Sequence, residues 1–301
     1  MLRPWLASAL SAPAAQTWVT IFVAIVIQAM PFVVLGTLLS AAIAVLVPAG
    51  FFAKALPRRA VLAVPIAGLA GAALPGCECA SVPIAGALVR RGVTPAAALA
   101  FLLSAPAINP VVLAATSVAF PGHPSMVFGR LVASLMTSIA MGWIWLRLGR
   151  SDLLRVPDHG HLAGMGRIDA FMTSMRHDLT QAGGFLVIGA FSAATLNVAV
   201  PQRWLHVVAS HDVISIFSMA LLAVVLSICS EADAFVAASL AQFSLTSRLA
   251  FLVVGPMVDM KLFAMQVGAF GRRFAVRFAP TTFAVGAVIA AAVGAGLWGL
   301  K

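Results

Sequence analysis

The chain has 301 residues, of which 62% are hydrophobic and only 9% are charged, whereas about a quarter of the residues in a typical soluble domain are charged. This composition excludes a soluble globular protein and indicates a membrane protein that contacts the lipid bilayer. Nineteen basic residues against nine acidic ones give a net charge of +10. Basic membrane loops explain this excess, so we expect no nucleic-acid partner.

Eight apolar segments follow one another along the chain, in long runs that do not alternate with polar residues as the strands of an outer-membrane barrel would. Most are as long as or longer than the roughly 20 residues that span a bilayer core. The first contains Pro31 at mid-depth and is expected to be one long or kinked helix. We therefore predict an all-α polytopic membrane protein with about eight hydrophobic helical segments. Their expected bounds are residues 18–53, 61–89, 94–120, 125–146, 182–200, 212–243, 247–270 and 275–299.

Polar stretches divide these segments into regions. Residues 1–17 have a basic start and small residues, but their apolar core is too short for a good signal peptide, so we expect a retained N-terminal tail. Residues 149–180 are rich in Arg, Asp and His and predict a polar loop, in which we interpret His159 and His161 as solvated rather than metal-binding. The loop separates a first membrane repeat, residues 18–148, from a second, residues 181–301.

The two membrane regions resemble each other at an offset of 150 residues. Without a gap, this shift places Cys79 on Cys229 and Asn109 on Asp259, and it also aligns two prolines. Internal repeats of this kind are typical of transporters, in which the binding site lies near the bilayer midplane where broken helices meet. We predict a duplicated unit of four segments.

The distribution of basic residues distinguishes two topologies. If all eight segments cross the membrane, Lys and Arg divide almost evenly between the two faces, ten against nine. If segments 61–89 and 212–243 instead enter and leave by the same face as re-entrant hairpins, 14 basic residues share one face and five the other. The positive-inside rule favours the second topology, in which the halves are inverted repeats of three crossings and one hairpin.

These two segments contain strong helix breaks. In the first, Pro75 and Gly76 cannot continue a helix comfortably, and Pro83 is suited to the first turn of a new one. The matching break in the second half is at residues 227–233. Non-helical backbone at membrane depth requires a protein interior or a water-filled cavity, so these breaks predict a transport pathway or a binding site.

All three cysteines of the chain, Cys77, Cys79 and Cys229, lie in these two breaks. Cysteine is also a common buried small residue, and this packing role remains an alternative. If the two breaks face each other, the three thiols form one site. Such a site suits a soft, thiophilic solute such as trivalent arsenic, or a metal ion such as Zn²⁺ or Cu⁺. A Cys-x-Cys pair is poorly placed to form a disulfide, which argues against a thiol enzyme.

Three of the nine acidic residues, Glu78, Glu231 and Asp233, lie inside the same breaks. A carboxyl group in a membrane segment is costly and is a functional candidate by default, so we expect these residues to couple transport to protons. A structural alternative for Asp233 is a capping box with Ser230 as the N-cap residue. We assign no role to the five acids of the polar loop and the segment edges, Asp152, Asp158, Asp169, Asp178 and Asp212.

A third break runs from Pro106 to Pro110 and has its counterpart around Pro256. Asn109 in this break is either a ligand of the solute or the N-cap of the half-helix that follows it. Asp259 is either a proton carrier or only the ion-pair partner of the lysine two residues later. In both interpretations the amide of Asn109 and the carboxylate of Asp259 face one region.

The stretches PGCECASVP and AFLLSAPAINP, and later CSEADAFVAAS and AFLVVGPMVDMK, are similar to the signatures of the predicted-permease family that includes the ArsP-like organoarsenical efflux permeases. The resemblance extends over about residues 18–299. It implies an inner-membrane permease with about eight spans that, in the best-known members, exports trivalent organoarsenicals such as methylarsenite. The family pattern usually has Cys-Ser-Cys where this chain has Cys77-Glu78-Cys79, so the two thiols carry over and the carboxylate is a departure.

These features together predict a secondary transporter of the inner membrane and not an enzyme. The chain has no Gly-rich phosphate loop with Lys, so an ion gradient or a separate subunit would drive transport, and we expect no cofactor. The alternative is the membrane subunit of a multi-component system that handles zinc or copper ions with a soluble partner. The expected solute ligands are Cys77, Cys79, Cys229 and Asn109, and the expected proton carriers are Glu78, Glu231, Asp233 and Asp259.

Overall fold

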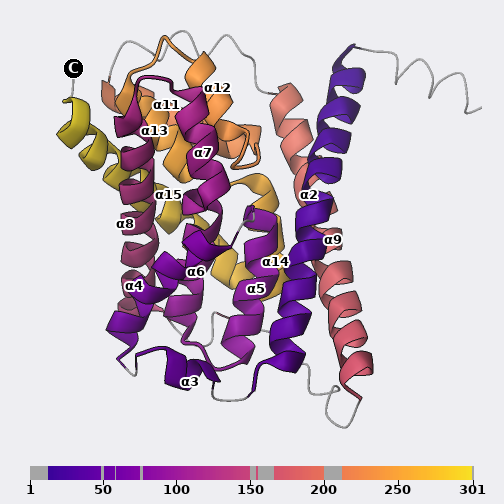
Figure 1. The fold of residues 1–301 in the computed structure, drawn as a ribbon. Coiled ribbons are helices and arrows are strands. Elements are labelled where there is room, and N and C mark those ends of the chain that lie inside the picture. The colour runs from indigo at the N-terminus through magenta and orange to yellow at the C-terminus, as the bar shows by residue number, and fades with distance from the viewer. Residues whose placement is uncertain are drawn as a thin grey trace, which may run out of the picture.

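The computed structural model of the chain is helical throughout the part that it describes (Figure 1). No strand occurs in this part, which confirms the prediction of an all-α protein. The described residues are 13–48, 51–57, 59–74, 77–149, 154, 166–199 and 212–299.

Five helical stretches among these residues are long and apolar enough to cross a membrane. One of the five is the pair α6 and α7, which only Asn109 separates. The helices of the five stretches are α2 (Pro13–Leu46), α6 (Pro95–Ile108), α7 (Pro110–Ala119), α8 (Pro124–Leu148), α9 (Arg167–Ala199) and α15 (Arg272–Trp298).

The remaining helices are shorter than a membrane span. The predicted segments 61–89, 212–243 and 247–270 are each divided into two such helices, so the prediction of eight segments is not confirmed as it was made. The short helices are α3 (Phe51–Ala55), α4 (Ala60–Ala70), the 3₁₀ turn η1 (Gly71–Ala73), α5 (Glu78–Arg90), α11 (Asp212–Leu226), α12 (Asp233–Ser239), α13 (Leu245–Val254) and α14 (Met260–Phe270).

The short helices of the two halves lie toward opposite ends of the molecule. Figure 1 places α4 and α5 in the lower half, where α4 begins and α5 ends near the same end of the molecule. It places α11 and α12 in the upper half. The hairpin topology requires this arrangement of the short helices. The topology itself stays a prediction, which the reporter fusions described below test.

Several helix boundaries recur at the predicted offset of 150 residues. α6 and α13 begin at residues 95 and 245, and α7 and α14 begin at residues 110 and 260. α8 and α15 end at residues 148 and 298. The duplicated unit remains a prediction, and these boundaries support it.

Two glycines of the long helices allow short helices to approach closely. A Cβ atom on Gly36 of α2 would lie 2.6 Å from the Cα atom of Ala80 in α5. A Cβ atom on Gly189 of α9 would lie 2.7 Å from the Cα atom of Lys261 in α14. Small residues at helix interfaces are typical of membrane proteins, because close backbone packing there replaces the hydrophobic effect. These two contacts position the first turns of α5 and α14.

Two helices begin earlier than the sequence predicts. α9 begins at Arg167, inside the expected loop 149–180, and α2 begins at Pro13, inside the expected tail 1–17. A helix that extends beyond the bilayer core has polar residues in its first turns, so hydropathy does not mark its start. The rest of the tail and the two loop histidines lie outside the described residues.

The hairpin topology predicts that Arg59 and Arg91, which flank α4 and α5, lie on the same face of the membrane. Reporter fusions that end after each of these two residues should therefore give the same compartment signal, and a fusion that ends after Arg203 should give the opposite one. Opposite signals from Arg59 and Arg91 would rule out a re-entrant α4–α5 pair.

Candidate functional site

Helices α5, α7 and α14 begin near the middle of the molecule, at or close to the predicted breaks (Figure 1). The first backbone N–H groups of a helix have no partner within it and carry a partial positive charge. Helix starts therefore attract hydrogen-bond acceptors and negative groups. The starts of α5 and α14 lie close together and form a polar centre in an otherwise apolar molecule.

Asn109 and Asp259 cap two of these helices in the same way. Asn109 Oδ1 accepts a hydrogen bond from the backbone N–H of Val112 at 2.9 Å, and Asp259 Oδ1 accepts one from Leu262 at 2.6 Å. The Asn109 amide nitrogen also donates to the carbonyl oxygen of Ala105 at 3.2 Å. The capping interpretation of Asn109 is thus confirmed, and it leaves this side chain little capacity to bind a solute.

Lys261, in the first turn of α14, is the cation of this centre. Its Nζ atom lies 2.8 Å from Glu78 Oε1 and 3.1 Å from Asp259 Oδ2. The Lys261 side chain is 0% exposed, and the two carboxylates are 1% exposed. Lys261 and Glu78 come from opposite halves of the chain, before and after residue 150, so this ion pair joins the halves at the centre. The predicted pairing of Asp259 with Lys261 is confirmed.

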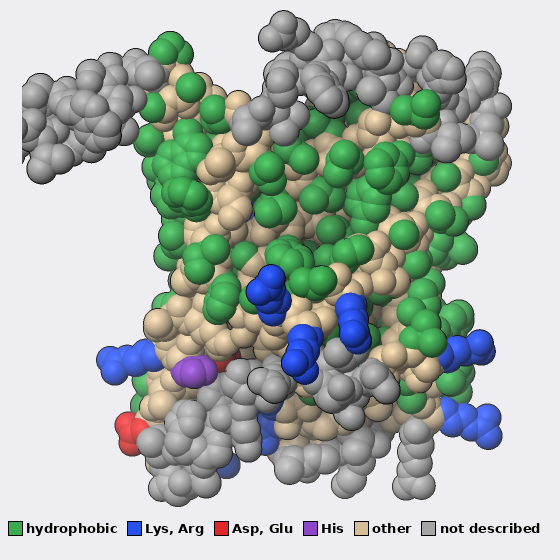
Figure 2. All heavy atoms as spheres, turned by 180° about the vertical axis from the view of Figure 1, so that it is seen from behind, with side chains coloured by type: hydrophobic (Ala, Val, Ile, Leu, Met, Phe, Trp, Pro, Cys, Tyr) green, Lys and Arg blue, Asp and Glu red, His purple; other side chains and the backbone are tan. Residues whose placement is uncertain are grey.

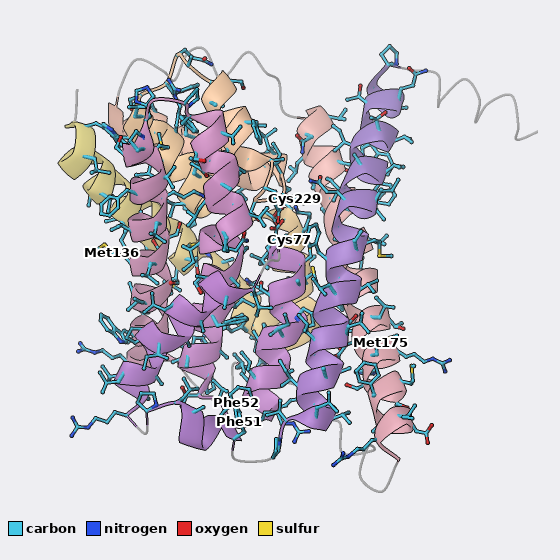
Figure 3. All side chains as sticks on the ribbon, viewed as in Figure 1. Phe51, Phe52, Cys77, Met136, Met175 and Cys229 are labelled. Carbon is cyan, nitrogen blue, oxygen red and sulfur yellow. The ribbon has the colours of Figure 1, made fainter. Side chains whose placement is uncertain are left out.

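The three cysteines gather around this ion pair. Cys77 and Cys79 flank Glu78, and Cys229 Sγ lies 3.9 Å from Lys261 Nζ. All three thiols are free and buried, and Figure 3 shows Cys77 and Cys229 near the middle of the molecule. In the part of the chain that the structure describes, no group of three or more His, Cys, Asp or Glu side chains is arranged to hold a metal ion. The geometry therefore gives no support to the metal-binding alternative for the thiols.

A second buried ion pair joins Arg130 of α8 to Asp233 at the start of α12. The contact is bidentate, with Nη1 to Oδ1 at 2.9 Å and Nη2 to Oδ2 at 2.7 Å. Arg130 also donates to Thr116 Oγ1 at 2.9 Å, and its side chain is 0% exposed. The capping-box alternative for Asp233 is wrong, because the N-cap residue of α12 is Ala232 and no side chain caps the helix. Asp233 is held as the counter-charge of Arg130.

Several buried polar atoms of the centre have no hydrogen-bond partner. They include the Oε2 atoms of Glu78 and Glu231 and the Oγ atom of Ser230. Most buried polar groups in proteins are paired, so an unpaired one indicates strain or a group that a ligand satisfies. Their unmet hydrogen bonds make the centre a candidate site for a ligand.

Of the predicted break prolines that the structure describes, all but Pro83 lie at or beside a break. Pro110 begins α7, and Pro256 lies in the turn between α13 and α14. Pro106 lies within the last turn of α6, directly before the break at Asn109. Pro83 does not begin a helix as predicted, because α5 begins five residues earlier at Glu78. Pro75 and Gly76 lie outside the described residues.

A third ion pair, which is partly buried, involves Asp178, a residue with no role predicted from the sequence. Asp178 of α9 lies inside the molecule, where its Oδ2 atom is 3.4 Å from Arg90 Nη2 and accepts a hydrogen bond from Ser40 Oγ at 2.5 Å. The helical extension of α9 toward Arg167 explains the error, because it brings Asp178 from an expected loop into a helix that packs on α2 and α5. Arg90 is the last residue of α5.

Arg130 and the central position of Lys261 were not predicted, because basic residues served to choose a topology and Lys261 was considered only as a neighbour of Asp259. Both lie within predicted apolar segments, 125–146 and 247–270. The rule that an ionisable residue in a membrane segment is a functional candidate applies to Lys and Arg as well as to carboxylates. Applied to the basic residues, it would have identified both.

Replacement of Lys261 by Met should strongly destabilise the protein, because it leaves the Glu78 and Asp259 carboxylates buried without a counter-charge. Loss of one partner of a buried pair typically costs about 3–5 kcal/mol. Adding Glu78→Gln to Lys261→Met should recover part of this loss, since the two side chains interact directly. The measurement is thermal unfolding of the purified protein in detergent, with Arg167→Met on the exposed start of α9 as the control. An unchanged unfolding temperature for Lys261→Met would contradict this account of the centre.

Comparison with known proteins identifies relatives over almost the whole chain. The model of a family described as a predicted permease, ArsP_1, matches residues 14–295. The UPF0718 protein YcgR of Bacillus subtilis is 38% identical over 262 residues, which cover 85% of this chain and 89% of that protein. A putative two-component membrane permease complex subunit of Streptococcus mutans is 33% identical over 270 residues, which cover 87% of this chain and 90% of that protein. No solved structure matches the chain.

The family match confirms the resemblance based on the sequence motifs around the cysteines and around Asn109 and Asp259. A permease family and several helices long enough to span a bilayer together indicate a multi-pass membrane protein that transports a solute. The chain therefore belongs to the predicted-permease family ArsP_1.

Proposed function

We propose that this permease moves a small thiophilic solute through the centre of the molecule, where Cys77, Cys79 and Cys229 bind it. The observation that carries the proposal is the meeting of thiols from both halves around the buried Lys261–Glu78 pair. Ionisable groups at membrane depth typically mark substrate and proton pathways. Soft thiol ligands suit a thiophilic solute such as a trivalent organoarsenical.

The thiols would bind such a solute by exchange. The two As–O bonds of methylarsenite to its hydroxyl groups are each replaced by an As–S bond to a cysteine, and each thiol proton leaves with a hydroxyl group as water. The third thiol contacts the arsenic through its sulfur lone pair and stays protonated. The exchange needs no oxidant or reductant. Glu78 lies between Cys77 and Cys79 in the sequence, and its Oε2 atom has no hydrogen-bond partner, so it is placed to carry the proton from the thiol to the leaving hydroxyl group.

Carboxylates of the same centre would couple transport to protons. Glu78 and Asp259 share the Lys261 ammonium, so protonation of one carboxylate strengthens the hold of the ammonium on the other. Glu231 is half-buried and has an unpaired oxygen, which makes it the third proton carrier. We assign Asp233 to a holding role instead, because both of its oxygens bind Arg130.

We further propose that the two halves are inverted repeats and that the lower face in Figure 1 faces the cytoplasm. The recurring helix boundaries support the repeat. Figure 2 shows the Lys and Arg side chains of the described residues gathered in the lower half of the face that it presents. Cytoplasmic loops of membrane proteins carry an excess of Lys and Arg, which supports this orientation and an inner-membrane location. Solute loaded from the lower face would then leave the cell.

Transport by inverted vesicles tests the thiol site. Vesicles that contain the protein should accumulate methylarsenite, and Cys77→Ser, Cys79→Ser and Cys229→Ser should each lower the rate of accumulation by about tenfold or more, the effect of losing about 1.4 kcal/mol of binding. The serine hydroxyl keeps the size of the side chain and removes the soft ligand. Zn²⁺ and Cu⁺ should not be accumulated.

Ala85→Ser is the matched control, because it introduces the same hydroxyl group at a buried position of α5 away from the centre. It should leave the rate of accumulation close to that of the unchanged protein. Full accumulation by all three cysteine variants would remove the thiols from the mechanism, and accumulation of Zn²⁺ would favour the metal-handling alternative.

A second candidate function is that of one subunit of a two-component permease. The observation that favours it is the name of the relative from Streptococcus mutans, which is described as a subunit of a two-component membrane permease complex. In this case the chain would form the membrane pathway, and a second protein would regulate or energise it.

Purified chain in proteoliposomes distinguishes the two candidates. If the chain is a self-sufficient secondary transporter, a proton gradient alone should drive accumulation of methylarsenite. Accumulation that occurs in native vesicles and is absent from proteoliposomes of the pure chain would favour the two-component complex.

A further inference from the structure

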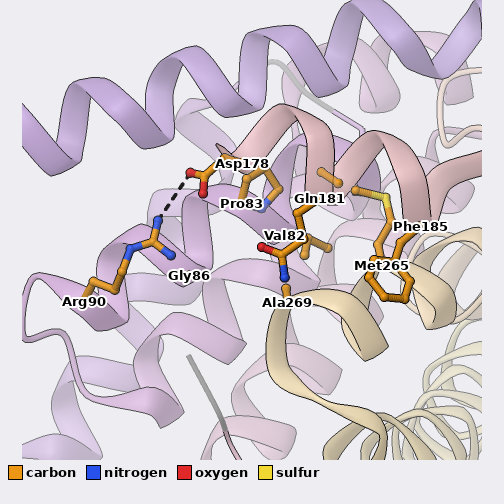
Figure 4. Close-up of a pocket in the computed structure, with 10 residues that line it drawn as sticks. Val82, Pro83, Gly86, Arg90, Asp178, Gln181, Phe185, Met265 and Ala269 are labelled. Atoms are coloured by element: carbon orange, nitrogen blue, oxygen red, sulfur yellow. Dashed lines mark hydrogen bonds and ion pairs between the residues drawn. The ribbon is translucent and has the colours of Figure 1, made fainter. Parts of the chain in front are cut away.

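A small cavity lies beside the Arg90–Asp178 ion pair (Figure 4). Its volume is about 30 Å³, which exceeds the roughly 10–15 Å³ that one water molecule needs. Helices α5, α9 and α14 line it with both apolar and polar side chains. The lining includes Val82, Gly86, Arg90, Asp178, Gln181 and Met265.

The inner end of the cavity adjoins the candidate site. Val82 lies one helical turn beyond Glu78 in α5, and Met265 lies one turn beyond Lys261 in α14. Residues four apart share a face of a helix, so the faces that carry the central ion pair continue as walls of the cavity. These shared helix faces place the cavity one turn from the central pair, on its lower side.

The outer end of the cavity is closed by Arg90, Asp178 and Ser40. Arg90 is about 18 Å along α5 from Glu78, at a rise of 1.5 Å per residue, and so lies near the lower end of the molecule. Arg90 Nη2 is 3.4 Å from Asp178 Oδ2, and Ser40 Oγ donates to the same oxygen. The three side chains belong to α5, α9 and α2, and Figure 4 shows the Arg90–Asp178 contact at one end of the lining residues.

We propose that the Arg90–Asp178–Ser40 cluster is the gate on the lower face and that the cavity is the vestibule between this gate and the central site. The inference rests on the proposed function of the Lys261–Glu78 centre as the solute site. When the gate pair separates, the vestibule opens to the lower face and the solute or a proton reaches the centre.

The gate pair is suited to open, and the central pair is not. The Arg90 side chain is 16% exposed and that of Asp178 is 7% exposed, so water at the surface can replace each partner. Lys261 and Glu78 would separate into the protein interior, where an uncompensated charge costs several kcal/mol. The cavity wall beside Arg90 is formed by Gly86, which has no side chain and leaves free space there. A Cβ atom added to Gly86 would have only Arg90 Nη1 within 4 Å.

The experiment places a reporter thiol in the vestibule. A Gly86→Cys variant should react slowly with a membrane-impermeant maleimide applied to the lower face. Adding Asp178→Asn removes the charge of the gate and keeps the shape of the side chain, and it should raise the labelling rate by about tenfold or more, the effect of a shift of about 1.4 kcal/mol in the closed–open equilibrium. Asp169→Asn, the same change at an exposed position of α9, should leave the rate unchanged. Protein without the added thiol measures reaction of the buried native cysteines.

Exchange of the Arg90 and Asp178 charges distinguishes an opened gate from a misfolded variant. The double variant Arg90→Asp with Asp178→Arg, made on Gly86→Cys, restores an ion pair and should return labelling to the slow rate. Labelling that ignores Asp178→Asn, that stays fast in the exchanged pair, or that occurs from the upper face would overturn the gate. None of these labelling rates depends on the solute. Normal transport by the cysteine variants would therefore contradict the thiol site and not the gate. Unchanged labelling in Asp178→Asn would contradict the gate and not the thiol site.

Discussion

The burial of the Lys261 ammonium is the constraint that organises the centre of this permease. An ammonium ion in a membrane protein's interior is stable only if carboxylates replace its water, and here Glu78 and Asp259 do so within 3.1 Å. Asp259 is held because it caps its own helix. Glu78 reaches the ammonium because α5 begins at mid-depth, so the break that precedes α5 is a requirement of this ion pair. The close contacts at Gly36 and Gly189 then bring both helix starts against the long helices α2 and α9.

The other two ion pairs, of which Arg130–Asp233 is fully buried and Arg90–Asp178 partly buried, follow the same rule at different levels. Arg130–Asp233 lies among the upper helices α7 and α12, Lys261–Glu78 lies at the centre, and Arg90–Asp178 lies near the lower end. Each pair joins a residue before position 150 to one after it. Any movement of one half against the other therefore changes at least one pair of buried charges. Such a change has a large energetic cost unless water, a proton or a solute replaces the lost partner.

The breaks could be predicted from the sequence because Pro and Gly have local effects that need no tertiary contacts. Asn109 could be predicted as a cap for the same reason, since a cap acts within four residues. The sequence predicts Asp259 only as a proton carrier or as the partner of Lys261, and its capping of α14 is a finding of the structure. Pro83 was misplaced because a proline is tolerated inside α5, where packing against other helices overrides its propensity. The partners of Asp178 and Asp233 could not be predicted, because Arg90 and Arg130 lie 88 and 103 residues away along the chain. Such pairings depend on how helices pack, which hydropathy does not describe.

The thiols acquire their significance from this electrostatic setting. A cysteine among apolar side chains is an ordinary packing residue, but Cys229 lies 3.9 Å from an ammonium whose nearest carboxylate, Glu78, stands between the two other cysteines in the sequence. A solute that bonds to these thiols must therefore displace or reorganise groups that hold Lys261. Because Lys261 also joins the two halves, binding of the solute and movement of the halves act on the same ion pair. Coupling of this kind needs no additional contact between the halves, because the Lys261 ammonium that stabilises the empty centre is also the group that the solute disturbs.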